Sequence, residues 1–314
     1  MVDLSVKLGN LEMPNPVMPA SGTFSPEMAQ VIDINALGAT MTKTVSRELR
    51  DGNPPPRVSE VECGMINCIG LPGKGLDYFL TELLPQYTQY IPPTIVSITS
   101  TTEEDFAAMA ADCSVPGVQA LEINISCPTR DPNGGNFALH ADHTANTVRQ
   151  VRAATDLPII VKLSPNAGDV VSIAKAAEDA GADALTVANT ILSMRIDTNS
   201  FRPSLGFKVG GMSGPAVKPI ILRMVYHVAK AVSIPIIGCG GIVKAEDVVE
   251  YMLAGASAVQ VGYASFRNPT AMISILEDLE KWCDKRGIAR VTDLTGAVDD
   301  DLETDTYIAA AAGI

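Results

Sequence analysis

The chain contains 314 residues and has a mass of 33.1 kDa, enough for one large α/β domain or two smaller ones that fold without disulfides or a structural metal. Hydrophobic residues make up 46% and charged residues 19%, and the 25 Gly and 21 Pro are spread along the chain, which excludes a disordered chain or a repetitive fibre. The formal net charge of −13 repels phosphate backbones and anionic lipids, so we expect no nucleic-acid partner.

The N-terminus and the cysteines favour a cytoplasmic chain. Residues 1–7 lack the basic region and apolar stretch of a signal peptide, and no apolar run approaches the roughly 18 residues that a membrane span needs. The spacing of the six cysteines includes no C-x-x-C pair, so it favours free thiols over a zinc or iron–sulfur site, and we expect no metal. The cysteines are Cys63, Cys68, Cys113, Cys127, Cys239 and Cys283.

The order of the predicted elements indicates a barrel. Residues 4–8 and 11–13, joined by Gly9-Asn10, predict a hairpin that closes its floor. Short runs that are apolar on both faces follow, as parallel strands covered by helices require, and several begin after a Gly that can end a helix. We predict eight strands, at residues 16–21, 39–45, 94–99, 118–126, 158–164, 182–189, 235–240 and 257–262. Their alternation with helices predicts an α/β protein with a (β/α)8 TIM barrel, formed as a single domain by residues 1–314.

Helices and long connections fill the gaps between these strands. We predict helices at residues 102–112, 169–180, 215–232, 245–254 and 269–285. Three connections are longer than a compact barrel requires, at residues 46–75, 128–140 and 191–214. All three follow the carboxyl ends of strands, where barrel enzymes bind their ligands, so we expect long loops over the C-terminal face of the barrel.

Polar residues and glycines cluster where the predicted strands end. They are Ser21, Lys43, Thr44, Asn124, Lys162, Asn189, Thr190, Gly240, Gly241, Gly262 and Tyr263. Gly240-Gly241 and Gly262-Tyr263 precede helices and bring backbone N–H groups to the loops after strands seven and eight, which often bind phosphate in this fold. Glycines also permit tight turns without any ligand, but the two segments together favour phosphate.

Two lysines and two asparagines extend this interpretation. Lys43 and Lys162 stand in apolar runs, where a lysine is costly unless an anion receives it, although a salt bridge at a strand end is an alternative. Two such lysines beside a phosphate site favour a large anionic cofactor. Asn124 and Asn189 match the alternating carbonyl and N–H edge of a pyrimidine or flavin ring, although either amide can instead cap a loop.

Cys127 is the most informative single residue. It follows strand four directly and precedes Pro128 at the start of a long connection. A thiol in this place acts as a base or nucleophile when neighbouring positive charge stabilises the thiolate. By residue type alone the alternative is a buried, inert cysteine, but the polar strand ends around it favour a chemical role.

Five segments resemble class 1 dihydroorotate dehydrogenases. They are Asn67-Cys68-Ile69-Gly70-Leu71, Asn124-Ile125-Ser126-Cys127-Pro128, Lys162-Leu163-Ser164-Pro165-Asn166, Ser213-Gly214-Pro215-Ala216 and Gly238-Cys239-Gly240-Gly241-Ile242. The resemblance runs from about residue 4 to about residue 285, and residues 211–242 are most similar to the class 1B catalytic subunit. It implies a (β/α)8 barrel that binds one FMN and oxidises dihydroorotate to orotate in pyrimidine biosynthesis.

The resemblance also implies roles for individual residues. The flavin would be surrounded by Ser21, Lys43, Thr44, Asn124, Lys162, Ala188, Gly214, Gly240, Gly241, Gly262 and Tyr263. The pyrimidine would be held by Lys43, Asn67, Cys68, Ile69, Gly70, Leu71, Asn124, Asn189 and Thr190. Cys127 would be the base that removes the C5 proton while a hydride passes from C6 to N5 of FMN, and Lys162 would stabilise negative charge on the reduced ring. Residues 128–140 would close over the substrate, with Gly134-Gly135 as a hinge.

The same resemblance implies partners for the chain. Class 1B relatives pass electrons to a subunit that carries FAD and a [2Fe-2S] cluster and thence to NAD, so we expect such a partner and a homodimer or heterotetramer. The acidic and alanine-rich segment 299–314 has no chemical signature that we can assign.

Three departures from the family pattern leave other functions open. Thr129, Gly73 and Ser97 stand where family members commonly have Asn, and the loss of amides that face a ligand alters substrate choice. One alternative is an FMN-dependent dihydropyrimidine dehydrogenase that acts on an uncharged ring such as dihydrouracil. Another is a phosphate-binding barrel subunit without catalytic activity, in which Cys127 is inert.

Overall fold

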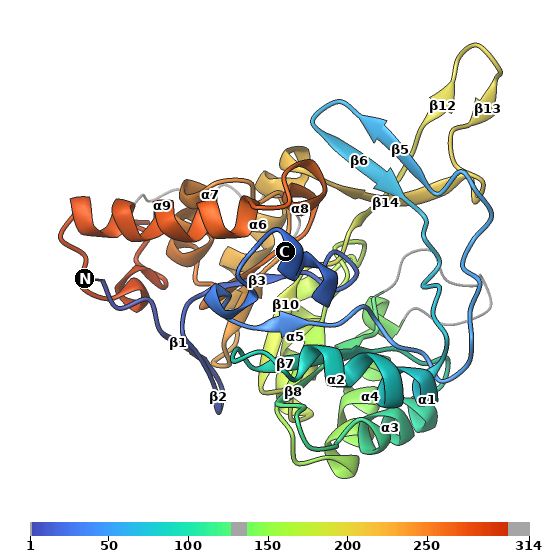
Figure 1. Ribbon diagram of the computed structural model, residues 1–314, viewed down its shortest axis with the longest axis horizontal. Coiled ribbons are helices and arrows are strands. Elements are labelled where there is room, and N and C mark those ends of the chain that lie inside the picture. The colour runs from blue at the N-terminus through green and yellow to red at the C-terminus, as the bar shows by residue number, and fades with distance from the viewer. Residues whose placement is uncertain (1, 127–136, 301–314) are drawn as a thin grey trace.

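Eight parallel strands form the central sheet of the computed structural model, which describes residues 2–126 and 137–300 (Figure 1). Their order is β3-β16-β15-β10-β9-β8-β7-β4. The strands are β3 (Val17–Pro19), β4 (Thr40–Met41), β7 (Thr94–Ile98), β8 (Ala120–Asn124), β9 (Ile159–Lys162), β10 (Ala184–Val187), β15 (Ile236–Gly238) and β16 (Ala258–Val261). Each lies within one predicted range, so the prediction of an eight-stranded TIM barrel is confirmed.

The barrel closes where its first two strands meet. The N–H of Gly38, just before β4, donates to the carbonyl oxygen of Val17 in β3 at 2.8 Å. A Cβ atom at residue 38 would lie 2.2 Å from the carbonyl oxygen of Asn15, so only glycine fits between these strands. At this seam between β3 and β4, the two backbones can approach closely only because residue 38 has no side chain.

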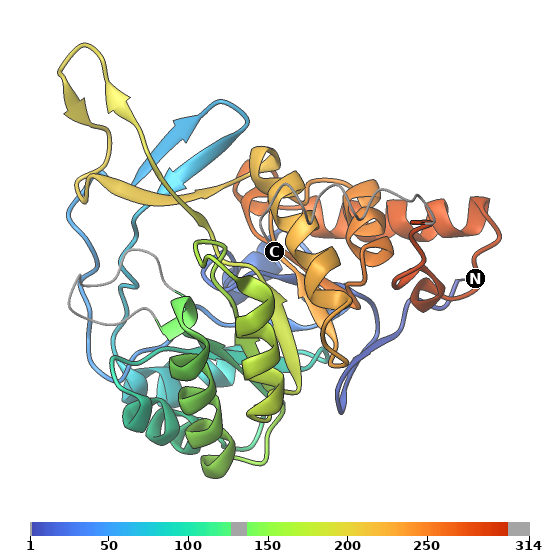
Figure 2. The ribbon, with the colours of Figure 1, turned by 180° about the vertical axis from the view of Figure 1, so that it is seen from behind.

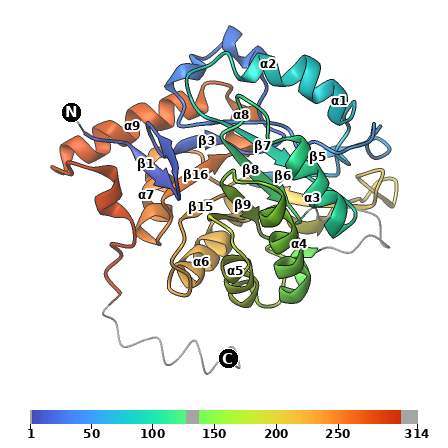
Figure 3. The same cartoon turned by 90° about the horizontal axis from the view of Figure 1, so that it is seen from below.

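Helices surround the strands, as the view in Figure 3 shows. They are α1 (Leu76–Tyr78), α2 (Leu84–Tyr87), α3 (Glu103–Asp112), α4 (Ala141–Ala154), α5 (Val170–Asp179), α6 (Lys218–Ala229), α7 (Ala245–Leu253), α8 (Tyr263–Arg267) and α9 (Ala271–Lys285). The five predicted helices are confirmed to within a few residues, and side chains cap two of them: Thr102 accepts from the N–H of Asp105, and Asp169 accepts from the N–H of Ser172. Between β3 and β4, two short 3-10 turns (Pro26–Gln30 and Ile34–Ala36) replace a helix.

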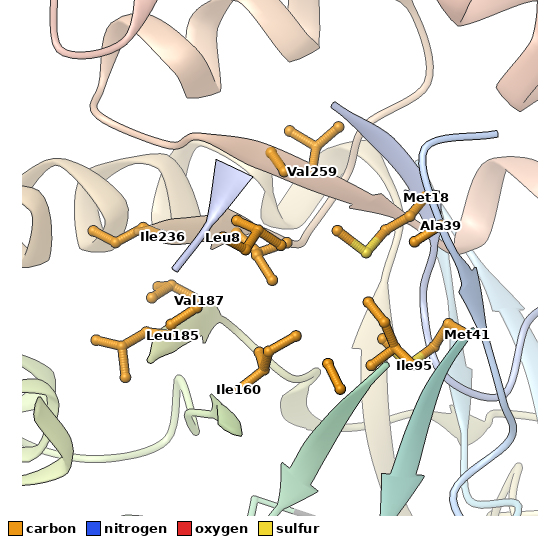
Figure 4. Packing of buried hydrophobic residues seen from close by; sticks show 14 of the residues in the cluster. Leu8, Met18, Ala39, Met41, Ile95, Ile160, Leu185, Val187, Ile236 and Val259 are labelled. Carbon is orange, nitrogen blue, oxygen red and sulfur yellow. The ribbon is translucent and has the colours of Figure 1, made fainter. Parts of the chain in front are cut away.

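The floor of the barrel is apolar. The predicted hairpin is present as β1 (Val6–Leu8) and β2 (Leu11–Met13). In each strand the first and last side chains are buried and the middle one is exposed. Figure 4 shows Leu8 amid strand side chains from around the barrel, including Met18, Ile160 and Ile236. All four are at most 2% exposed, so apolar side chains fill this end of the barrel.

A second sheet lies over the carboxyl ends of the barrel strands. It contains β5 (Val58–Val61), β6 (Gly64–Asn67), β11 (Ile191–Met194) and β14 (Val209–Ser213), in the antiparallel order β11-β14-β6-β5. The hairpin of β12 (Ile196–Asp197) and β13 (Arg202–Pro203) projects beyond it (Figures 1 and 2). The connections 46–75 and 191–214, which we expected to be loops, thus form one sheet in which Asn67 pairs with Gly211. Local sequence patterns do not reveal this pairing, because the two residues lie far apart in the sequence.

The third long connection, residues 128–140, lies mostly outside the described residues, as do Cys127, Thr129 and Gly134-Gly135. Its end forms a short 3-10 turn at Phe137–Leu139 that leads into α4. Within residues 2–126 and 137–300, no helix combines the length and the apolar character needed to cross a membrane.

We expect Gly38→Ala to destabilise the protein by about 2 kcal/mol or more, because the added methyl group would overlap the carbonyl of Asn15 and force the barrel seam apart. Urea unfolding followed by circular dichroism measures the change in the free energy of unfolding. Gly168→Ala is the matched control, since nothing lies within 4 Å of a Cβ atom there. Equal stability of the two variants would contradict the assigned seam.

Candidate active site

A cavity of about 600 Å³ lies between the carboxyl ends of the barrel strands and the second sheet. It collects most of the residues that the sequence analysis selected. Those lining it are Ser21, Lys43, Thr44, Asn67, Ile69, Gly70, Leu71, Asn124, Lys162, Ala188, Asn189, Thr190, Gly240, Gly241, Gly262 and Tyr263. Strands far apart in the sequence therefore contribute to one site at the face where TIM barrels bind their ligands.

Of the selected residues that the structure describes, two do not line the cavity. Cys68 is completely buried in a small cluster with Ile66 and Leu205, where its thiol donates to the carbonyl oxygen of Pro56 at 3.8 Å. Gly214 has a φ of 113° and contacts the glycine loop after β15, because a Cβ atom on Gly241 would lie 2.8 Å from its carbonyl oxygen. Cys68 therefore supports the cavity wall from behind, and Gly214 supports the glycine loop after β15.

Lys162 forms the charged floor of the cavity. It is 4% exposed, and its Nζ donates to Oε1 of Gln260 at 2.9 Å and to Oγ of Ser21 at 3.3 Å. The carboxylate of Glu122 lies 3.6 Å away and is fully buried. The alternative of a salt-bridged lysine is therefore realised through Glu122, and Lys162 also lines the cavity, where an anionic ligand stays a prediction.

Asparagine side chains define the wall next to the floor. Nδ2 of Asn124 donates to Oγ1 of Thr44 at 3.1 Å, and Nδ2 of Asn189 donates to Oγ of Ser126 at 3.0 Å. Oδ1 of Asn189 accepts from the N–H of Thr190 at 2.8 Å. These bonds fix the orientation of both amides, so each presents a defined pattern of donors and acceptors.

Lys43 also lines the cavity, next to Thr44. Its Nζ donates to the carbonyl oxygen of Pro72. Burial, and next the positive charge of Arg57, lower the pKa of the Lys43 ammonium. An anionic ligand would relieve both effects, which makes this part of the cavity suited to a carboxylate or a similar group.

The glycine loop after β15 presents bare backbone. Gly241 has a φ of 70°, in the region that favours glycine, and a Cβ atom there would lie 2.8 Å from both the Gly214 oxygen and Cβ of Lys218. The phenol of Tyr251 donates to the carbonyl oxygen of Gly240 at 2.7 Å and holds the loop from below. Packing behind the loop therefore requires the glycine at 241, and because Gly240 and Gly241 both line the cavity, the loop presents backbone without side chains to a ligand.

Several lining residues were missed by the sequence analysis. They include Thr23, Val58, Glu60, Met65, Met212, Ser213, Cys239, Gln260, Ile242, Phe266 and Arg267. Gln260 had a readable signal, because a long polar side chain inside an apolar strand needs a buried partner. The residues of the second sheet had none, since their place over the cavity depends on pairing between distant segments.

Two of the three departures from the family pattern, Ser97 and Gly73, do not line the cavity. Ser97 is fully buried and donates to Oε1 of Glu122 at 3.2 Å, below the floor. Gly73 exchanges two backbone hydrogen bonds of 2.9 Å with Arg50 and does not line the cavity. Thr129 lies outside the described residues. Within those residues, no group of three or more His, Cys, Asp or Glu side chains is arranged to hold a metal.

The fold and the site together define a TIM-barrel protein with a ligand cavity at its C-terminal face. The family described as dihydroorotate dehydrogenase matches residues 3–282, and the chain belongs to this family. The chain is 46% identical to a protein of Pelobacter propionicus over 300 residues, which are 95% of this chain and 99% of the relative. It is 48% identical to one of Geobacillus kaustophilus over 296 residues, 93% of this chain and 95% of the relative.

Both relatives are named dihydroorotate dehydrogenase B (NAD(+)), catalytic subunit, as is one of Bacteroides thetaiotaomicron that is 44% identical over 302 residues, 95% of this chain and all of the relative. The similarity to the class 1B catalytic subunit, and with it the expectation of an oxidoreductase of this family, are therefore confirmed.

We expect iodoacetamide to alkylate Cys63 at least about tenfold faster than Cys239 at pH 7.5. Cys63 is exposed, whereas burial raises the pKa of the Cys239 thiol at the cavity wall and lowers its thiolate fraction about tenfold for each unit of increase. Peptide mapping by mass spectrometry at timed intervals measures each rate. Cys113, where burial raises the pKa to about 12, is the unreactive control. Faster alkylation of Cys239 than of Cys63 would contradict this placement.

Proposed function

We propose that this chain is the FMN-binding catalytic subunit of a dihydroorotate dehydrogenase and oxidises dihydroorotate to orotate in pyrimidine biosynthesis. The observation that carries the proposal is the convergence of Lys43, Asn124, Lys162, Asn189 and the Gly240-Gly241 loop on one cavity. Family membership over residues 3–282 supports the same reaction. We propose further that residues 1–314 act as one domain.

The residues around the cavity fit FMN. A flavin mononucleotide combines a phosphate with a polar ring edge, and the cavity offers backbone N–H groups without side chains at Gly241 together with a buried cation at Lys162. Ser21, Thr44 and Ala188 line the space between these groups and the strands. We propose that Gly262 and Tyr263 complete the phosphate side, and that Gly214 supports it through Gly241.

The reaction removes a proton from C5 and a hydride from C6 of dihydroorotate, which leaves a double bond between these carbons. When bound, FMN supplies the acceptor for the hydride. The protein must supply the base, exclude water and hold the ring, and we propose that Asn67, Asn124, Asn189 and Thr190 hold the pyrimidine by hydrogen bonds. Lys43 and the backbone of residues 69–71 would bind its charged edge, while Cys68 would support this segment from within the wall.

We propose Cys127 as the base that takes the C5 proton. The residue itself lies outside the described part of the chain, but its predecessor Ser126 is fully buried and bonds to Asn124 and Asn189. The backbone thus leaves β8 at the wall where the proposed substrate amides lie. This supports a thiol at the site rather than an inert core cysteine.

Dihydroorotate is favoured over dihydrouracil by the charge of the wall. Ser97 and Gly73, which raised the alternative of an uncharged ring, do not themselves line the cavity. Burial and the charge of Arg57 lower the pKa of Lys43 and so disfavour its charged form. A carboxylate, which dihydroorotate has and dihydrouracil lacks, would stabilise this ammonium.

We propose that electrons leave through a second subunit that carries FAD and a [2Fe-2S] cluster and reduces NAD, in a heterotetramer built on a homodimer of this chain. The support is the name of the relatives, which are catalytic subunits of an NAD-linked enzyme. The free cysteines of the described residues suit the reducing cytoplasm, where we expect the complex to act.

The purified chain loaded with FMN tests the reaction directly. We expect anaerobic dihydroorotate to bleach the flavin absorbance completely, and dihydrouracil at the same concentration to bleach it at least about 100-fold more slowly, because the Lys43 ammonium would lack a carboxylate to bind. Stopped-flow absorbance measures both rates. Bleaching by dihydrouracil alone would establish the alternative substrate, and a chain that binds no flavin would support the non-catalytic barrel.

We expect Cys127→Ser to slow flavin reduction by dihydroorotate by about 100-fold or more at pH 7, because a hydroxyl is a far weaker base than a thiolate, while FMN remains bound. The rate should rise with pH more steeply than in the unmodified chain. Cys283→Ser is a control, since this cysteine is fully buried in α9 away from the cavity. Full activity of Cys127→Ser at neutral pH would remove the assigned base.

A further inference from the structure

A buried hydrogen-bond network lies under the floor of the cavity and is centred on Glu122. Its carboxylate is completely shielded from solvent in the middle of β8. Oε2 accepts from Nε2 of Gln260 at 2.7 Å and from Oγ1 of Thr186 at 3.3 Å, and Oε1 accepts from Oγ of Ser97 at 3.2 Å. Three strands thus direct a donor at one carboxylate that does not itself line the cavity.

Gln260 connects this carboxylate to Lys162. Its amide is 1% exposed and has one orientation that satisfies both neighbours, with the NH2 group toward Glu122 and Oε1 toward the Lys162 ammonium at 2.9 Å. The reversed amide would place the NH2 group against the ammonium. Glu122 therefore determines the direction of the acceptor that Lys162 uses.

The ammonium of Lys162 has three N–H donors, of which Gln260 and Ser21 receive two. Glu122 attracts it from 3.6 Å, which is longer than a charge-assisted hydrogen bond. The amide of Gln260 thus separates the two charges and keeps the ammonium at the cavity surface. Without it, a shift of less than about 1 Å would bring Lys162 into direct contact with the carboxylate.

We infer that Glu122 and Gln260 are positioning residues that set how strongly Lys162 stabilises negative charge in the cavity. The inference rests on the proposed function, in which the cavity holds FMN. Glu122 weakens the field of the lysine by its opposite charge, and Gln260 maintains that field by holding the ammonium away from the carboxylate. Together they fix the preference of the site for reduced over oxidised FMN.

The two residues act in opposite directions, which gives a test that a merely structural role would fail. In Gln260→Met, Lys162 would contact Glu122 directly, so the affinity for reduced FMN relative to oxidised FMN should fall about tenfold and the midpoint potential should become more negative. In Glu122→Gln the negative charge that weakens the field of Lys162 is lost. The affinity for reduced FMN relative to oxidised FMN should therefore rise, and the midpoint potential should become more positive.

Midpoint potentials from equilibration with a redox dye at pH 6.5, combined with dissociation constants for oxidised FMN from flavin fluorescence, measure both quantities without turnover. Thr186→Val is the matched control, because it removes one donor to the same carboxylate and alters no charge. Its potential should stay close to that of the unmodified protein, and a shift as large as that of Glu122→Gln would overturn the inference.

Shifts of the two variants in the same direction, or no shift in either, would also overturn it. Loss of a buried charge partner is destabilising, and if Glu122→Gln does not fold, an unchanged potential in Gln260→Met alone is decisive against the inference. An unmodified chain that binds no FMN would refute the proposed function together with this inference. Normal FMN binding with unshifted potentials would refute the inference only.

Discussion

The burial of a lysine inside a closed barrel is the constraint on which the site depends. An ammonium taken out of water is costly unless an opposite charge and hydrogen-bond acceptors surround it. Here Glu122 supplies the charge, and Gln260 and Ser21 supply the acceptors. Because these partners come from separate strands, the network also fixes the register at which the strands can pack, and the upper half of the barrel is polar while its floor around Leu8 is apolar.

The cavity therefore combines two physically different groups that can bind an anion. Lys162 acts as a charge held by buried side chains, whereas the loop at Gly240-Gly241 acts through backbone that carries no side chain. The loop is itself held by the phenol of Tyr251, and burial raises the pKa of this phenol so that it remains a donor to the Gly240 oxygen. Such fixed dipoles need no rearrangement when a ligand binds, which suits a site that stabilises changing charge.

The second sheet explains how one barrel end becomes an enclosed site. Segments 58–67 and 191–213 leave the barrel after different strands and pair through Asn67 and Gly211, so they reinforce one another over the opening. Glycine is required at residue 211 because a Cβ atom there would lie 1.9 Å from Oγ1 of Thr190. The sheet thereby contacts the end of β10, where Asn189 and Thr190 line the cavity.

The sequence by itself determined the barrel, the helices around it, the hairpin at its floor and most of the residues that line the cavity. The elements and the polar strand ends follow from local patterns, namely apolar strands and glycines that end helices, which need no knowledge of distant contacts. Asn67, the segment 69–71 and Ala188 were instead expected only from the resemblance to a known family. Only the tertiary structure decided that Glu122 and Ser97 lie beneath the floor, that Gln260 joins them to Lys162, and that Cys68 points into the wall. The physical reason is that the register between strands of a closed barrel, and not spacing along the chain, decides which side chains share a layer.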